Sequence, residues 1–227
     1  MFFRLAKSHF LQNIVINILN SVHPSIEHNL AKIETLKRAF FHCKIEKIQG
    51  GYFEFGMYEG TSFLAAIKIS QKLDGNRNFY GFDSFEGMRY FNDADRHPFF
   101  KEGEFASSYE KVSKRFRQYR NARIYKGYFE ESIKNQDARK LCGENKAAVV
   151  FIDCDLSTPA KIALDFVGPI LQPGTVIILD DYWAYKGNPS KGVAGAFNQF
   201  LKENPKIEAR EYYRYGYGGN SFLVSRV

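Results

Sequence analysis

The stretch VVFIDCDLS (149–157) decides the fold, because an apolar run stops on two aspartates that are separated by one cysteine. An unpaired charge is costly to bury, so Asp153 and Asp155 are expected where a buried strand ends. A second stretch, TVIILDDYW (175–183), repeats the pattern with Asp180 and Asp181. Two buried strands that each end in carboxylates predict a shared polar rim on one sheet.

Short β-type runs alternate with helical patterns along the rest of the chain. Such repeated βα units predict an α/β fold with a parallel sheet and helices on both faces. Two final β-type runs joined by GYGGN have no helix between them, which predicts a closing antiparallel hairpin. Ligands bind such sheets beyond the carboxyl ends of the strands, where the strand order reverses. We expect strands at 51–55, 78–83, 122–127, 147–153, 175–180, 207–215 and 221–227, and helices at 61–73, 107–120, 129–141, 159–171 and 191–203.

The length of 227 residues suits one sizeable domain, which we assign to 49–227, after an N-terminal helical segment at 1–48 that acts as a lid or a dimer contact. Three cysteines without metal-type spacing favour a reducing compartment, so a cytoplasmic location is expected.

The N-terminal segment has the spacing of an amphipathic helix and contains no run long enough to span a membrane. We interpret it as a helix packed on the domain or on a second subunit of a homodimer. A membrane-surface anchor that uses Arg4 and Lys7 is the alternative. The residues at helical spacing are Leu11, Ile14, Val15, Ile18 and Leu19.

The chain carries a net charge of +7, and six of its basic residues crowd into positions 111–123. Val112, Phe116 and Tyr119 interrupt this run at helical spacing, which predicts one packed face and one solvated basic face. Nucleic acid is therefore not expected as a partner, and an anionic substrate such as a nucleotide-linked sugar is more plausible. The basic residues are Lys111, Lys114, Arg115, Arg117, Arg120 and Arg123.

The turn EFGMYEGTS (54–62) is the candidate cofactor loop between a strand and a helix. Tyr58 replaces the second glycine of a dinucleotide-binding loop, and Glu54 adds negative charge, so a cationic ligand without a pyrophosphate is favoured. A simple tight turn with Thr61 or Ser62 as a helix cap would look similar. Asp83 ends the second strand, where it could bind ribose hydroxyls, although capping by Asp83 or Ser84 explains it equally well.

Four carboxylates that meet at neighbouring strand ends would repel one another unless a cation neutralised them. Oxygen ligands favour a hard cation such as Mg²⁺, and zinc is not expected because all five histidines precede this region. Strand alternation predicts that Asp153 and Asp155 point the same way. A capping role for Asp155 is redundant if Thr158, before Pro159, caps the next helix.

Several longer motifs resemble the macrocin O-methyltransferase family, which belongs to the class I S-adenosylmethionine-dependent methyltransferases. They are YGFDSFEGM, GYFEESI, VVFIDCDLSTPAKIALDFVGPILQPGTVIILDDYW and KGVAGAFNQFL, and the similarity runs from about Tyr52 to Leu223. The resemblance implies a Rossmann-like sheet of seven strands, S-adenosylmethionine and a divalent metal. It also implies that the chain lacks the long N-terminal region of larger relatives.

The resemblance further implies a role for each candidate residue. Asp153, Asp180 and Asp181 would bind the metal, and Asp155 would be the general base. The cofactor positions would be Glu54, Gly56, Tyr58, Thr61, Ser62, Asp83, Ser84 and Asp153, with Gly127, Tyr128 and Phe129 in the turn beside the adenine.

The resulting hypothesis is a metal-dependent O-methyltransferase whose acceptor is a hydroxyl of a small molecule, most readily a sugar. A catechol-type enzyme with a phenolic acceptor and a non-catalytic cofactor-binding domain are the alternatives. The aromatic segment 86–105 is either a lid or a loop packed permanently on the surface.

Overall fold

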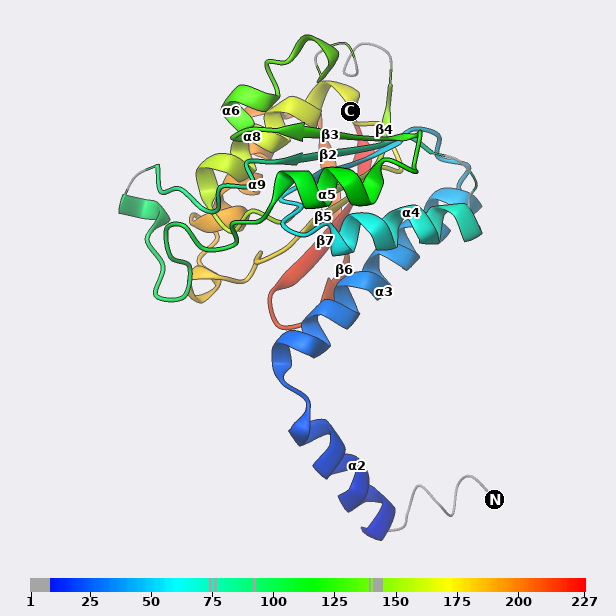
Figure 1. Ribbon diagram of the computed structural model, residues 1–227, viewed down its shortest axis with the longest axis vertical. Coiled ribbons are helices and arrows are strands. Elements are labelled where there is room, and N and C mark those ends of the chain that lie inside the picture. Colours follow the sequence, from blue (N-terminus) through cyan, green and yellow to red (C-terminus); the bar gives the residue numbers. More distant parts are fainter. Residues whose placement is uncertain (1–8, 74, 76, 92, 139, 141–144) are drawn as a thin grey trace.

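The computed structural model describes residues 9–73, 75, 77–91, 93–138, 140 and 145–227. Seven strands form one sheet in the order β3-β2-β1-β4-β5-β7-β6 (Figure 1). This confirms the predicted mostly parallel sheet with its antiparallel C-terminal hairpin. The strands are β1 (Gly51–Phe55), β2 (Phe79–Asp83), β3 (Ala122–Lys126), β4 (Ala147–Ile152), β5 (Val176–Leu179), β6 (Glu208–Tyr215) and β7 (Gly219–Arg226).

The strand order reverses between β1 and β4, which lie side by side in the middle of the sheet. β1 pairs in parallel with both β2 and β4, and β4 pairs in parallel with β5. The carboxyl ends of these four strands therefore meet at one rim. Beyond β5 the hairpin of β6 and β7 continues the sheet with antiparallel pairing.

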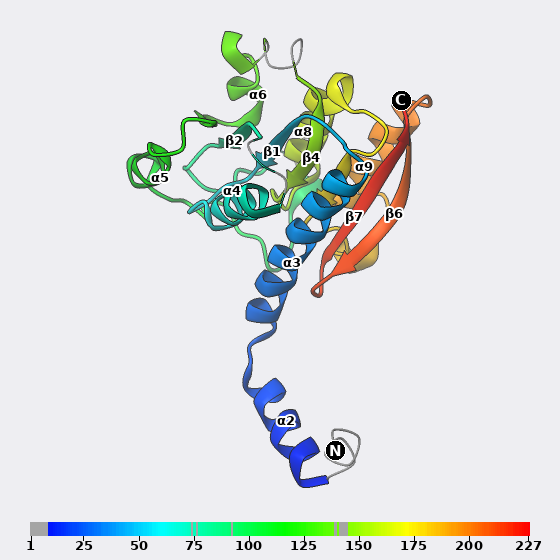
Figure 2. The ribbon, with the colours of Figure 1, turned by 90° about the vertical axis from the view of Figure 1, so that its right-hand side faces the viewer.

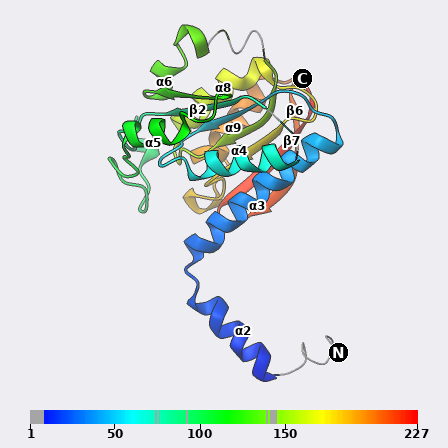
Figure 3. The same cartoon turned by 45° about the vertical axis from the view of Figure 1, so that its right-hand side comes forward.

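Two helical layers bury the two faces of the sheet (Figures 1 and 3). One layer holds α3 (Pro24–Ile45), α4 (Thr61–Leu73) and α5 (Tyr109–Phe116), with Phe40, Phe63 and Phe116 in its core. The other holds α6 (Phe129–Ser132), α8 (Ser157–Val167) and α9 (Gly192–Glu203), with Leu164 and Phe197 in its core. Short 3₁₀ turns, η1 (Asp93–Asp95), η2 (Gly168–Ile170) and η3 (Tyr185–Gly187), complete the described elements.

The N-terminal helix α2 (His9–Ser21) projects away from this body (Figures 1 and 2). The predicted helix is present, but within the described chain none of its residues is buried, and Phe10, Ile14 and Ile18 are exposed. Arg4 and Lys7, proposed for membrane contact, lie outside the described residues. Among the residues that are described, we find no helix with the length and apolarity needed to cross a membrane.

Two residues define the N-terminus of α3. Pro24 stands in its first turn, and the side chain of His23, the N-cap residue, accepts a hydrogen bond from the Ser25 amide. Its second half packs into the core through Leu36 and Phe40. Its first half instead runs past the rim where the parallel strands end, which matters for the site below.

Helix boundaries differ from the prediction at several places. The helix expected at 129–141 is broken, because α6 ends at Ser132, and the helix expected to reach 171 ends at Val167. The basic helix α5 ends at Phe116 rather than near 120, although Val112 and Phe116 are buried as expected. The helix α8 begins at Ser157, so the expected Thr158 cap is wrong. Leu156 takes the cap position and makes no side-chain capping bond in the described structure. The cause is the left-handed backbone of Asp155, with φ of 61°, which turns the chain sharply before the helix.

The segment 86–105 packs against the rim through its aromatic residues. The Tyr185 hydroxyl donates a 2.8 Å hydrogen bond to the Asp95 carbonyl, and the rings of His97 and Tyr185 meet edge to face. Met88 pairs with Gly103 and Glu104 through backbone hydrogen bonds, which closes the segment into a hairpin-like loop.

Candidate active site

A cavity of about 700 Å³ opens at the carboxyl ends of β1, β2, β4 and β5, where the strand order predicted a ligand site. The first half of α3 and the segment 86–105 form its outer walls. It brings together most of the predicted site residues: Gly56, Tyr58, Thr61, Ser62, Asp83, Ser84, Tyr128, Phe129, Asp153, Asp155, Asp180 and Asp181. Glu54 and Gly127 are the two predicted residues that do not line it.

The turn between β1 and α4 contacts the ends of both neighbouring strands, β2 and β4. Gly56 has φ of +92°, and a Cβ atom there would lie 1.7 Å from the Asp153 carbonyl oxygen, so only glycine fits. The Asp83 carboxylate accepts hydrogen bonds from the amides of Met57, Tyr58 and Phe85 at 2.6, 2.8 and 2.6 Å. Burial nevertheless raises the pKa of Asp83, against the lowering effect of these amides. Asp83 therefore shapes the loop as well as lining the cavity.

Glu54 lies behind the cavity wall and is fully buried. Its carboxylate accepts hydrogen bonds from the Tyr52 hydroxyl and, at 2.7 Å, from the Ser62 hydroxyl. Burial raises the pKa of Glu54 to about 7, although these two hydroxyls and the Lys32 ammonium act in the opposite direction. Ser62 faces the cavity, so it links the buried carboxylate to whatever binds there.

The turn after β3 supplies an aromatic wall. The Arg89 guanidinium lies 3.9 Å from the ring centroid of Tyr128 and is paired with Glu130. Gly127 has φ of +130° and forms the bend that presents Tyr128 and Phe129 to the cavity. A flat ring could stack in this position, as the predicted adenine site requires.

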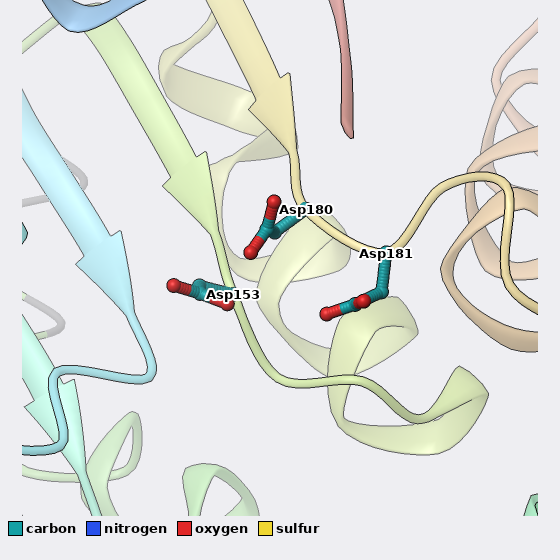
Figure 4. Close-up of side chains that lie close together, drawn as sticks. All are labelled: Asp153, Asp180 and Asp181. Carbon is teal, nitrogen blue, oxygen red and sulfur yellow. The ribbon is translucent and has the colours of Figure 1, made fainter. Parts of the chain in front are cut away.

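Three carboxylates converge at the ends of β4 and β5 (Figure 4). One oxygen each from Asp153, Asp180 and Asp181 lies within 4.8 Å of the others. β4 ends at Ile152, so pleated alternation does not reach Asp155 and was the wrong reason for its placement. Asp155 and Asp181 both have left-handed backbones, with φ of 61° and 50°, and these turns bring their side chains to the shared space.

The negative charge of this cluster is only partly compensated. Burial raises the pKa values of Asp153 and Asp181 well above their ordinary range and that of Asp155 to about 7, and repulsion between neighbouring carboxylates adds to the effect. Asp180 is the exception: burial acts to raise its pKa, but the Lys32 ammonium and the His28 hydrogen bond outweigh it and lower the value.

Two residues of α3, missed by the sequence analysis, reach this cluster from one face of the helix. The Lys32 Nζ atom lies 2.7 Å from an oxygen of Asp153 and 2.7 Å from an oxygen of Asp180. His28 Nε2 donates a 2.9 Å hydrogen bond to Asp180, which also accepts one from the Tyr215 hydroxyl at 2.8 Å. All five histidines precede the aspartates in the sequence, as noted above, but this order did not reveal that His28 reaches Asp180. The i, i+4 spacing of His28 and Lys32 was the available signal.

The donor set fits a hard divalent cation. All three clustered ligand atoms are carboxylate oxygens, the type that Mg²⁺ prefers. One ammonium lies among four carboxylates, and after burial, repulsion between these carboxylates contributes to the raised pKa values of three of them. A divalent cation would relieve this repulsion. Cys154 lies between Asp153 and Asp155. It packs against the core on the side of α6, α8 and α9 and is not a candidate ligand.

Comparisons with known proteins show what this chain is similar to. The profile of the macrocin O-methyltransferase (TylF) family matches residues 24–209. A curated relative from Streptomyces olivaceus, 8-demethyl-8-(2,3-dimethoxy-alpha-L-rhamnosyl)-tetracenomycin-C 4'-O-methyltransferase, is 28% identical over 175 residues. The match covers 70% of this chain, and it spans 64% of the length of that relative.

Two solved structures share the fold. A calicheamicin methyltransferase superposes with a TM-score of 0.69 at 20% identity, covering 96% of this chain and 88% of the other. The O-methyltransferase NovP gives a TM-score of 0.67 at 19% identity, covering 86% of this chain and 80% of the other.

Proposed function

The chain belongs to the macrocin O-methyltransferase family, and we propose that it transfers a methyl group from S-adenosylmethionine to a hydroxyl of a small molecule. The observation that carries the proposal is the meeting of two half-sites in one cavity: the β1–α4 turn with Asp83, and the aspartates at the ends of β4 and β5. Methyl transfer to oxygen needs a bound sulfonium donor beside a group that removes the acceptor proton.

The donor would lie along the first half-site. Asp83 and Ser84 at the end of β2, which line the cavity, would bind the ribose hydroxyls, and Tyr128 would lie beside the adenine ring. Ser62 and the buried Glu54 behind it would attract the positively charged part of the cofactor. The cationic character of S-adenosylmethionine suits a turn that carries a carboxylate and lacks the glycine pattern for a pyrophosphate.

The acceptor would be activated at the second half-site. Asp153, Asp180 and Asp181 would hold Mg²⁺ or another hard divalent cation, which when bound supplies Lewis acidity toward the acceptor hydroxyl. Asp155 lines the same cavity and is our candidate for the base that receives the hydroxyl proton as the oxygen attacks the methyl carbon. The sulfonium sulfur leaves with its bonding electron pair as neutral S-adenosylhomocysteine.

A sugar is our proposed acceptor. The tetracenomycin relative acts on a rhamnosyl group, by its name, and a sugar offers the neighbouring hydroxyls that a metal could hold together. The net charge of +7 also favours an anionic form such as a nucleotide-linked sugar. We place the reaction in the cytoplasm, in keeping with three cysteines that lack metal-type spacing.

The test is a transfer assay with a labelled methyl group and three acceptor classes: nucleotide-linked sugars, neutral glycosides and catechols. We expect labelled sugar products, loss of activity in EDTA and its return with Mg²⁺. Labelling of catechols alone would contradict the sugar assignment. Transfer that continues undiminished in chelator would contradict the metal role, and failure of S-adenosylhomocysteine to bind in calorimetry would contradict the methyltransferase assignment.

A further inference from the structure

Lys32 occupies the place where the metal is expected. Its ammonium lies 2.7 Å from Oδ2 of Asp153 and 2.7 Å from Oδ2 of Asp180, and its side chain is 12% exposed. Both carboxylates belong to the trio that could hold a metal ion. Lys32 therefore uses one oxygen from each of two candidate ligands.

An ammonium and a divalent cation compete for these two carboxylates. Mg²⁺ binds carboxylate oxygens at about 2.0–2.1 Å in a near-octahedral geometry, so it competes with Lys32 for their lone pairs. Two positive charges a few ångströms apart in a poorly solvated site also repel strongly. Both effects favour departure of the Lys32 ammonium when a metal enters.

The orientation of Asp180 does not rest on Lys32 alone. The second oxygen of Asp180, Oδ1, accepts hydrogen bonds from His28 Nε2 at 2.9 Å and from the Tyr215 hydroxyl at 2.8 Å. These bonds hold the Asp180 carboxylate in orientation while Oδ2 changes its partner.

We propose that Lys32 is an exchangeable counter-cation, which neutralises Asp153 and Asp180 while the metal is absent and is displaced when the metal binds. This inference rests on the proposed metal-dependent function. It assigns to α3 a role in the metal equilibrium: the ammonium stabilises the metal-free protein and lowers the affinity of the site for metal.

The test compares Mn²⁺ binding by Lys32→Met, which removes the charge and keeps the length, with binding by the wild type. Lys37→Met is the matched control, because Lys37 is an exposed lysine of the same helix whose ion pair with Glu34 lies at the surface. Trp183, the single tryptophan of the chain, lies two residues from Asp181, so its fluorescence provides a readout that needs no turnover.

We expect Lys32→Met to bind Mn²⁺ at least about tenfold more tightly than the wild type, because a charge-assisted interaction no longer competes. The metal-free variant should also melt at a lower temperature than the metal-free wild type. Its melting temperature should rise more when Mn²⁺ is added than that of the wild type. Lys37→Met should match the wild type in both measurements. If Lys32→Met does not fold, Lys32→Gln, which keeps a hydrogen-bond donor, carries the same expectation.

The outcomes separate this inference from the proposed function. Equal or weaker Mn²⁺ binding by the Lys32 variants would overturn the displacement, and labelled-methyl transfer would still test the enzyme independently. Binding by the variants but not by the wild type would support displacement and contradict the metal dependence of the natural enzyme. Absence of binding in every protein would overturn both the inference and the metal role.

Discussion

Cofactor affinity should depend on pH through Glu54. In the free protein, burial raises the pKa of Glu54 to about 7, so this carboxyl is largely protonated below that pH. The α-ammonium group, which S-adenosylhomocysteine shares with S-adenosylmethionine, favours the ionised form, so binding lowers the pKa of Glu54 and must expel its proton when the pH is below 7. Affinity for S-adenosylhomocysteine is therefore expected to rise as the pH increases to about 7 and then to level off.

The size of the effect follows from the distance in pH below 7. At pH 5.5 the protonated form of the free carboxyl exceeds the ionised form by a factor of roughly 30. This factor is the upper limit of the loss of affinity relative to pH 8.5. Glu54→Gln keeps an acceptor for Ser62 but cannot ionise, so its affinity should be weaker at high pH and nearly independent of pH. Glu34→Gln, a change to a half-exposed carboxyl on α3, should behave like the wild type.

Isothermal titration calorimetry in buffers of different ionisation enthalpy measures both the affinity and the number of protons released. Close to one proton should be released at pH 6 by the wild type and none from position 54 in Glu54→Gln. Stability should mirror this: a folded pKa above the unfolded value makes the cofactor-free protein lose stability as the pH rises from about 4.5 to about 7. A wild-type affinity that does not change between pH 5.5 and 8.5, or the same pH dependence in Glu54→Gln, would refute the reasoning.

Three further changes test the other parts of the site. Asp155→Asn should slow single-turnover transfer by about 100- to 10,000-fold while Mn²⁺ binding stays near wild type; loss of metal binding would make Asp155 a ligand instead. Asp181→Asn should weaken Mn²⁺ binding, measured by Trp183 fluorescence, because it removes a negative charge from the cluster, and unchanged affinity would exclude Asp181 as a ligand. Gly56→Ala should lower the free energy of unfolding by about 2 kcal/mol or more in chemical denaturation, since its Cβ would meet the Asp153 carbonyl at 1.7 Å; a stable variant that still binds cofactor would contradict this packing.

The sequence predicted the sheet and the gathering of the aspartates because both follow from local patterns. The apolar run before Asp153 identifies a buried strand end, and the βα alternation places it beside the run that ends at Asp180. Lys32 and His28 were missed because they lie 121 and 152 residues from their partners, and their i, i+4 spacing shows only that they share a helix face, not that carboxylates lie opposite it. The left-handed turn at Asp155 was missed for another reason: the alternating pattern does not reveal where a strand stops and the backbone reverses.

The contact between Gly56 and Asp153 has a consequence for redesign of this enzyme. The Asp153 amide donates a 2.8 Å hydrogen bond to the Phe55 carbonyl, and the Asp153 carbonyl lies against the glycine. In the proposed function, the separation between the methyl donor and the metal would therefore be set by the backbone pairing of β1 with β4, which side-chain exchange does not alter. Libraries that seek new acceptors should leave this strand pair untouched and vary the outer walls, Ile26 and Leu30 of α3 and Phe99 of the 86–105 segment, where exposed apolar side chains border the cavity.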